Sequence, residues 1–174
     1  MLVLGIDPGL SRCGYGAVRK ARRPAAEAAG VLSTPTDTDR ASRLAELQAD
    51  VRALIAELRP DVVAVERLLF QRNVATAMAV GQAVGVVFAE AASAGCEVVE
   101  YSPNEVKEAV AGWGGADKQE MAEMVRVLLG LRELLRPADA SDAVAVALCH
   151  LARLGPTPPT AGPRRGAVIS SSAR

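Results

Sequence analysis

Two short segments that are apolar on both faces of an expected strand limit the fold more than any other feature of the chain. Residues 2–6 read Leu-Val-Leu-Gly-Ile, and residues 62–65 read Val-Val-Ala-Val. A strand of this kind must be covered on both sides by other elements, because neither of its faces can be left in water. The sequence therefore predicts a sheet with a layer of helices on each face.

The remaining hydrophobic pattern supplies the other parts of such a sheet. Three more strands are expected, at 15–19, 27–32 and 97–101. Apolar residues recur at intervals of three and four over 41–58, which indicates an amphipathic helix. Further helices are expected over four ranges, namely 73–94, 103–111, the residues after 118, and 138–154. The prediction is an α/β fold with a five-stranded mixed sheet.

Composition indicates one globular domain followed by a tail. The chain has 174 residues, of which 50% are hydrophobic and only 3% aromatic, so its core must consist mainly of Ala, Val and Leu. Residues 1–154 are expected to form the domain. Residues 155–174 contain four prolines and a run of three serines, and they are expected to form a flexible tail.

Charge does not identify a partner by itself. The 20 basic residues equal the 20 acidic ones, which removes the general argument for nucleic-acid binding, although residues 1–24 carry five basic residues against one acid. The three cysteines are widely spaced and form no C-x-x-C pair, so a disulfide framework and a zinc site are not supported. The start of the chain lacks a signal-peptide pattern, and the least charged stretch, 74–89, is shorter than a membrane span. A cytoplasmic location without a membrane is expected.

Four acidic residues stand where the predicted fold brings them together. Asp7 and Glu66 end the two apolar strands, and the ends of neighbouring parallel strands lie side by side. Asp139 and Asp142 are three residues apart on the last helix, whose apolar continuation must lie against the sheet. Singly, these acids have ordinary explanations: a turn, a strand end that reaches water, and a favourable charge at a helix start. Together they form a candidate site.

Such a cluster requires a cation. Two like charges 4 Å apart repel by about 4 kcal/mol at an effective dielectric constant of 20. Oxygen ligands without His or Cys suit Mg²⁺ or Mn²⁺, and a pair of such ions is a common device in phosphodiester hydrolysis. His150 is expected to pack in the core rather than to bind a metal.

A glycine-rich segment, 112–118, lies between two lysines, Lys107 and Lys118. It lacks the Lys-Ser/Thr of a Walker A motif, so a nucleotide-binding P-loop is rejected. A glycine-rich loop beside two cations is nevertheless able to approach a phosphate backbone closely. Two ordinary solvated lysines beside a turn remain the alternative.

Six motifs together resemble the bacterial Holliday junction endonuclease family RuvC, in order from residue 1 to about 154. They are Ile6-Asp7-Pro8-Gly9, Val65-Glu66-Arg67, Gly81-Gln82-Ala83 in the helix from Asn73, and the segments 102–107, 112–118 and 138–143. The resemblance implies a ribonuclease H-like fold and symmetrical, Mg²⁺-dependent cutting of four-way DNA junctions. It implies two metal ions per site, with Mn²⁺ as a possible substitute, bound by Asp7, Glu66, Asp139 and Asp142.

The resemblance also implies partners and DNA contacts. Lys107 and Lys118 match basic positions that the family uses on DNA, and Phe70, Arg72 and Asn73 are expected to contact DNA as well. The family commonly carries Phe three residues after the glutamate, where this chain has Leu69, so the residue that inserts into the junction stays open. A homodimer and a branch-migration helicase complex are the implied protein partners.

The helix at 73–94 is the expected dimer surface. It is apolar on more than the one face that a sheet covers, and Gly81 and Gly85 allow another helix to approach closely. A helix fully buried within one subunit remains the alternative.

Two other functions are weighed. An actin-like ATPase also has an Asp-x-Gly turn after its first strand, but it needs two domains, for which 174 residues are too few. A non-catalytic junction-binding module is the second alternative, and the presence of all four acids argues against it.

Overall fold

The computed structural model describes residues 1–67 and 74–155. This part of the chain contains five strands and five helices. The strands are β1 (Leu2–Asp7), β2 (Arg12–Arg19), β3 (Ala25–Ser33), β4 (Val62–Glu66) and β5 (Glu97–Tyr101). The helices are α1 (Arg40–Leu58), α2 (Val74–Ser93), α3 (Pro103–Ala111), α4 (Lys118–Leu129) and α5 (Ala138–Arg153).

The strands form one mixed sheet in the order β3-β2-β1-β4-β5. β1 pairs antiparallel with β2, and β2 antiparallel with β3, whereas β1, β4 and β5 run parallel. The predicted five-stranded mixed sheet is confirmed. β2 and β3 are longer than expected because Arg12 pairs with Ser33 and Arg19 with Ala25. Backbone hydrogen bonds continue the ladder beyond the apolar residues, so hydrophobic pattern underestimates these two strands.

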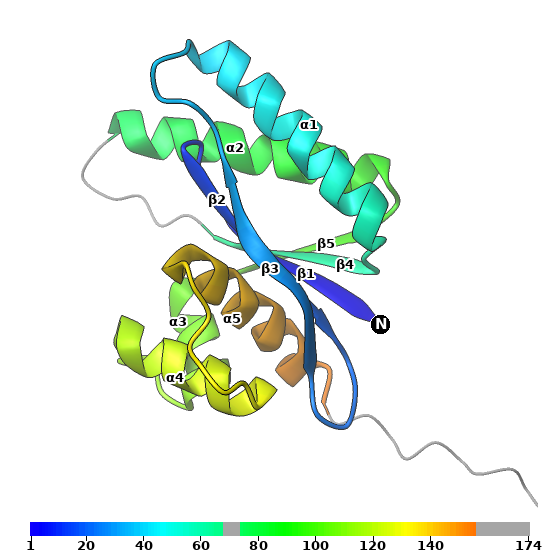
Figure 1. Cartoon of the computed structure of the whole chain (residues 1–174), viewed down its shortest axis with the longest axis vertical. Coiled ribbons are helices and arrows are strands. Elements are labelled where there is room, and N and C mark those ends of the chain that lie inside the picture. Colours follow the sequence, from blue (N-terminus) through cyan, green and yellow to red (C-terminus); the bar gives the residue numbers. More distant parts are fainter. Residues whose placement is uncertain (68–73, 156–174) are drawn as a thin grey trace, which may run out of the picture.

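Helices cover both faces of the sheet, as the apolar strands predicted. Figure 1 shows α1 and α2 on one face and α3, α4 and α5 on the other. Side chains alternate between the two resulting cores: Leu4 and Ile6 pack on the α1–α2 side, while Val3 packs on the α5 side. The two central strands, β1 and β4, are therefore buried on both faces.

Helix α5 lies against the sheet with unusually little separation. A Cβ atom at Gly5 of β1 would overlap the backbone of Ala143, and one at Gly16 of β2 would overlap Val144. Glycine at these positions lets the helix backbone approach the strands directly. Every residue of α5 from Ala143 to Leu151 is buried, so the sheet fixes the helix and its acidic first turns.

The two short helices on this face begin within one residue of where the sequence placed them. Ser102 and Asp117 are N-caps, and each forms a capping box with a glutamate three residues later, Glu105 or Glu120. The helix predicted after Ser102 is confirmed, and the one predicted after Lys118 is present and begins one residue earlier, at Lys118 itself.

Helix α2 is only partly covered within the subunit. Its buried residues are Ala83, Val87, Glu90 and Ala91. By length and composition alone the 20-residue helix could cross a membrane, with a mean hydropathy of 1.6 over 18 residues, whereas the least charged stretch within it, 74–89, is shorter than a span. Its inner side nevertheless packs on the sheet and on α1.

Candidate active site

The carboxylates of Asp7 and Glu66 lie next to each other at one edge of the sheet. β1 and β4 are parallel neighbours with Ile6 opposite Val65, so the next residue on each strand is an acid. Glu66 is also opposite Tyr101 of β5. The sheet register therefore brings these two predicted site residues together.

Both carboxylates have raised pKa values, and in each case burial is the largest cause. Burial raises the pKa of Asp7 to about 7, and the charges of Glu66, Asp142 and Asp139 add to this rise. Burial also raises the pKa of Glu66, with the charge of Asp142 as the next cause, although a hydrogen bond with Asp7 acts in the opposite direction. A carboxyl group whose pKa is raised by burial and by neighbouring carboxylates would be stabilised in its charged form by a bound cation.

Helix α5 brings Asp142 to the same edge. The Nζ atom of Lys118, the first residue of α4, lies 3.4 Å from Oδ2 of Asp142. The charge of Asp142 raises the pKa of Lys118, and Asp7 and Asp139 contribute in the same direction. Lys118 is 86% exposed, so this cation is held loosely and remains accessible to a ligand.

The carboxylate of Asp139 is bound by Arg12, a residue that the sequence does not identify as part of the site. Nε and Nη2 of Arg12 donate to Oδ2 of Asp139 at 2.8 and 2.6 Å. Arg12 is the first residue of β2, and the contact is possible because a Cβ at Gly14 would overlap the Asp139 backbone. The opposite charges were visible in the sequence, but the 127 residues between them gave no signal of contact.

The four acids have the ligand atoms that divalent cations prefer, but their side chains are not yet arranged around an ion. Within residues 1–67 and 74–155, no three Asp, Glu, His or Cys side chains are placed to hold an ion as they stand. The four carboxylates offer oxygen ligands only, and Asp7 is left without a cation partner of its own in this part of the chain. Such a donor set matches Mg²⁺ or Mn²⁺.

Of the other predicted residues, Lys107 and His150 lie within the described part of the chain, and three residues before α2 do not. Lys107 of α3 is half-buried and acts on the site, since its charge lowers the pKa of Glu66. His150 packs in the core with its Nδ1 2.8 Å from the hydroxyl of Tyr101, as expected. Phe70, Arg72 and Asn73 lie outside the described residues, so their predicted DNA contacts have no structural counterpart here.

The sheet order, the two helical layers and their likeness to solved structures define a ribonuclease H-like α/β protein. More narrowly, the chain belongs to the RuvC family, because the family model described as crossover junction endodeoxyribonuclease RuvC matches residues 3–150.

Individual relatives agree with this assignment. A crossover junction endodeoxyribonuclease RuvC of Heliobacterium modesticaldum is 52% identical over 150 residues, which is 86% of this chain and 93% of the relative. A structure of Thermus thermophilus RuvC superimposes with a TM-score of 0.82 at 39% identity, covering 90% of this chain and 98% of that one. T. thermophilus RuvC in complex with a Holliday junction substrate gives a TM-score of 0.84 at 39% identity, covering 88% and 94%.

Proposed function

We propose that this chain is a structure-selective endonuclease that resolves four-way DNA junctions by symmetrical, divalent-metal-dependent hydrolysis of phosphodiester bonds. Its membership of the RuvC family, and the Holliday junction bound by the T. thermophilus relative, support the choice of substrate. The observation that carries the proposal is the pair of carboxylates, Asp7 and Glu66, side by side at the strand ends with Asp142 close enough to raise both pKa values. Neither of the alternative functions is favoured by these findings.

Four acids would hold the metal. Asp7 and Glu66 bind from the sheet, and Asp139 and Asp142 bind from the first two turns of α5. When bound, two Mg²⁺ or Mn²⁺ ions stabilise the attacking and leaving oxygens of the phosphodiester. The elements that carry these acids keep a fixed position because β1, β4 and α5 are all held by the core.

Two lysines would hold the DNA beside the acids. Lys118 is exposed and already lies next to Asp142, and Lys107 acts electrostatically on Glu66. Both are suited to contact phosphates on the α3–α4 side of the acids, where such contacts position the duplex without reading its sequence. Phe70, Arg72 and Asn73 would add contacts from the segment that follows β4.

A cleavage assay on a synthetic four-way junction tests this function. The protein is expected to produce paired nicks at symmetrical positions with Mg²⁺ and none in EDTA, and to leave linear duplex of the same sequence intact. Binding without cleavage in either Mg²⁺ or Mn²⁺ would favour the non-catalytic module. ATP hydrolysis without cleavage would favour the actin-like alternative.

The exposed face of α2 is the proposed dimer surface. Val74 is 72% exposed and Met78 is 55% exposed, and the next exposed positions along this face are Gly81 and Gly85. These residues are spaced by four, three and four, so they form one apolar stripe on the helix. A two-fold dimer suits a junction whose opposed strands need two equivalent sites.

A Gly85→Arg substitution tests the dimer without disturbing the subunit, because a Cβ at Gly85 has nothing within 4 Å. The variant is expected to be a folded monomer that converts a cruciform plasmid to open circles rather than to linear DNA. Ala53→Arg, on the exposed side of α1, is the matched control and should stay dimeric. A Gly85→Arg variant that still sediments as a dimer would contradict the assignment.

The remaining parts of the proposal follow from the same family membership. Residues 1–154 would act as the nuclease domain, with 155–174 as its flexible tail. A branch-migration helicase complex would be the second protein partner, and the enzyme would work in recombination and repair in the cytoplasm.

A further inference from the structure

A basic pocket lies beside the acids on the α1–α2 side of the sheet. Its volume is about 490 Å³, and its lining includes Ser11, Arg12, Arg40 and Arg43 together with the first two turns of α2. Three of these residues carry a positive charge, and among the described residues that line the pocket there is no Asp or Glu. A concave surface with this charge favours an anionic ligand.

The charge of Arg43 is fixed in place but is not neutralised by the groups that hold it. Its Nε donates to Oγ1 of Thr34 at 3.1 Å, and its Nη2 donates to Oγ of Ser11 at 2.5 Å. Both acceptors are uncharged hydroxyls. Thr34 is itself 5% exposed and donates to the carbonyl of Leu10, so the support is rigid. A pre-positioned guanidinium loses little freedom when it binds an anion.

The position of Arg40 is electrostatically unfavourable for helix α1. It is the first residue of α1, where a positive charge meets the positive end of the helix dipole. The neighbouring carboxylate of Asp39 is occupied by the backbone amides of Ala41 and Ser42 and by the Ser42 hydroxyl. Helix stability therefore does not favour an arginine here, whereas an anion bound in the pocket would.

Arg12 connects this pocket to the proposed active site. The same guanidinium that lines the pocket is bound to Asp139 at the start of α5. Lys107 and Lys118 stand on α3 and α4, which cover the opposite face of the sheet from α1 and α2 (Figure 1). The acids at the sheet edge thus have cations on both sides.

We propose that this pocket, through Arg40 and Arg43, binds a backbone phosphate of the junction DNA next to the phosphate at the acids. The inference rests on the proposed function. It adds a second set of phosphate contacts, separate from those of Lys107 and Lys118. Contacts on both sides of the acids would fix the direction in which the DNA strand crosses the sheet edge, which is the role of sequence-independent phosphate contacts.

Salt dependence of binding tests the pocket directly. The affinity for a four-way junction is measured in EDTA, so that no cleavage occurs, at several KCl concentrations. Arg40→Gln and Arg43→Gln are each expected to reduce the slope of log affinity against log salt by about 0.9, the value for one lost phosphate contact. Arg43→Lys is expected to keep the wild-type slope, because it retains the charge although it loses the planar fork.

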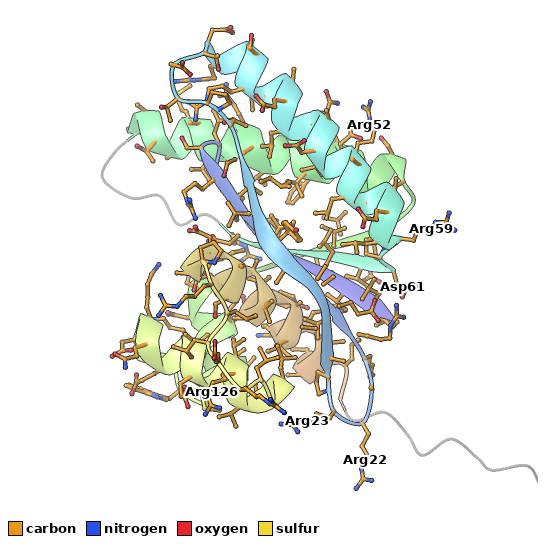
Figure 2. All side chains as sticks on the ribbon, viewed as in Figure 1. Arg22, Arg23, Arg52, Arg59, Asp61 and Arg126 are labelled. Carbon is orange, nitrogen blue, oxygen red and sulfur yellow. The ribbon has the colours of Figure 1, made fainter. Side chains whose placement is uncertain are left out.

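Arg22→Gln is the control for a general loss of charge. Arg22 projects from the β2–β3 turn, away from α1 (Figure 2), and its substitution should leave the slope unchanged. Thermal denaturation of each variant separates a folding defect of Arg43→Gln from a binding defect, and Arg40→Gln removes no hydrogen bond to the rest of the fold that the structure shows.

A second measurement locates the phosphate. Single phosphates around the cleavage position are replaced by uncharged methylphosphonates, and the loss of affinity is compared between proteins. At one of these positions wild type and Lys118→Ala should lose affinity, while Arg43→Gln should not. The proposal that the pocket binds a phosphate would be overturned by either of two results. One is that wild type and Arg43→Gln lose equal affinity at every methylphosphonate position, and the other is that both arginine variants keep the wild-type salt slope. Failure of wild type itself to bind or cut the junction would instead overturn the proposed function.

Discussion

Two acids, the buried Glu90 and the half-buried Asp7, have opposite surroundings. Glu90 of α2 is 7% exposed, and Arg52 of α1 donates to both of its carboxylate oxygens at 2.8 Å, with Gln48 at 2.6 Å. These hydrogen bonds, that of Arg52 first, lower the pKa of Glu90. Asp7 is close to other carboxylates, and burial together with their charges raises its pKa to about 7.

This difference distinguishes an acid that stabilises the fold, Glu90, from an acid that is available to bind a ligand, Asp7. The cation for Glu90 comes from the neighbouring helix, so the pair joins α1 to α2 and is complete. Asp7 lacks such a partner within the described residues, and its charged form is unfavourable until a cation arrives from solution. A half-buried acid whose charge the fold does not balance is therefore the better indicator of a binding site.

The largest expected effect comes from Asp7. Asp7→Asn keeps the side-chain shape but removes the charge that would bind metal, so junction cleavage in Mg²⁺ should fall by at least about 1000-fold, or roughly 4 kcal/mol in activation free energy. Junction binding in EDTA should be retained, because a negative charge facing DNA is lost. Asp37→Asn, at an exposed position, is the control. Cleavage by Asp7→Asn near the wild-type rate would remove Asp7 from the site.

The second prediction concerns stability against pH in the absence of divalent metal. The folded state raises the pKa of Asp7 from 3.8 to about 7, so the folded protein binds this proton more tightly than the unfolded chain does. The free energy of unfolding should therefore decrease as pH rises from about 4 to about 7, by roughly 2–4 kcal/mol for this group.

Chemical denaturation at pH 5 and pH 8 in EDTA measures this decrease. Asp7→Asn should show a smaller decrease than wild type, and Mg²⁺ should restore stability to wild type at pH 8 more than to the variant. Glu66, whose pKa is also raised, leaves a residual decrease in Asp7→Asn. Identical pH dependence of the two proteins would contradict the view that Asp7 is uncompensated.

Glu90 is expected to behave in the opposite way. Glu90→Gln removes the charge that Arg52 and Gln48 are arranged to hold, and the melting temperature at pH 7 should fall by roughly 3–6 °C. Cleavage per folded molecule should be unchanged, because the α1–α2 pair is separate from the acids. Reduced cleavage with unchanged stability would contradict the view that Glu90 stabilises the fold while Asp7 binds metal.

The smallest effect is expected at Lys118. Its ion pair with Asp142 resembles the Arg52–Glu90 pair in charge, but Lys118 is 86% exposed and its 3.4 Å contact is long, so it adds little to folding. Lys118→Ala should leave the melting temperature within about 2 °C of wild type and reduce the salt slope of junction binding by about 0.9. Lys107→Ala should do the same. An unchanged salt slope in both variants would show that these lysines are ordinary solvated residues that do not contact the DNA.

Local pattern was sufficient for most of the fold and for the candidate acids. Strands apolar on both faces required two helical layers, and Ser102 followed by Pro103 is a helix start that the sequence itself shows. Asp7 and Glu66 could be paired in advance because adjacent parallel strands align their ends. The lengths of β2 and β3 could not be obtained in this way, since their outer residues are joined by backbone hydrogen bonds that no side-chain pattern records.

The sequence by itself determined the element order, the two-sided burial of β1 and β4, and the acids at their ends, because these depend on hydrophobic periodicity and local capping. Only the tertiary structure decided which charges meet. Arg12 reaches Asp139 because glycines in β1 and β2 let α5 approach the sheet, and Glu90 is balanced by Arg52 because α1 and α2 lie side by side. Electrostatic partnership depends on distance in space, and separation along the chain does not encode it.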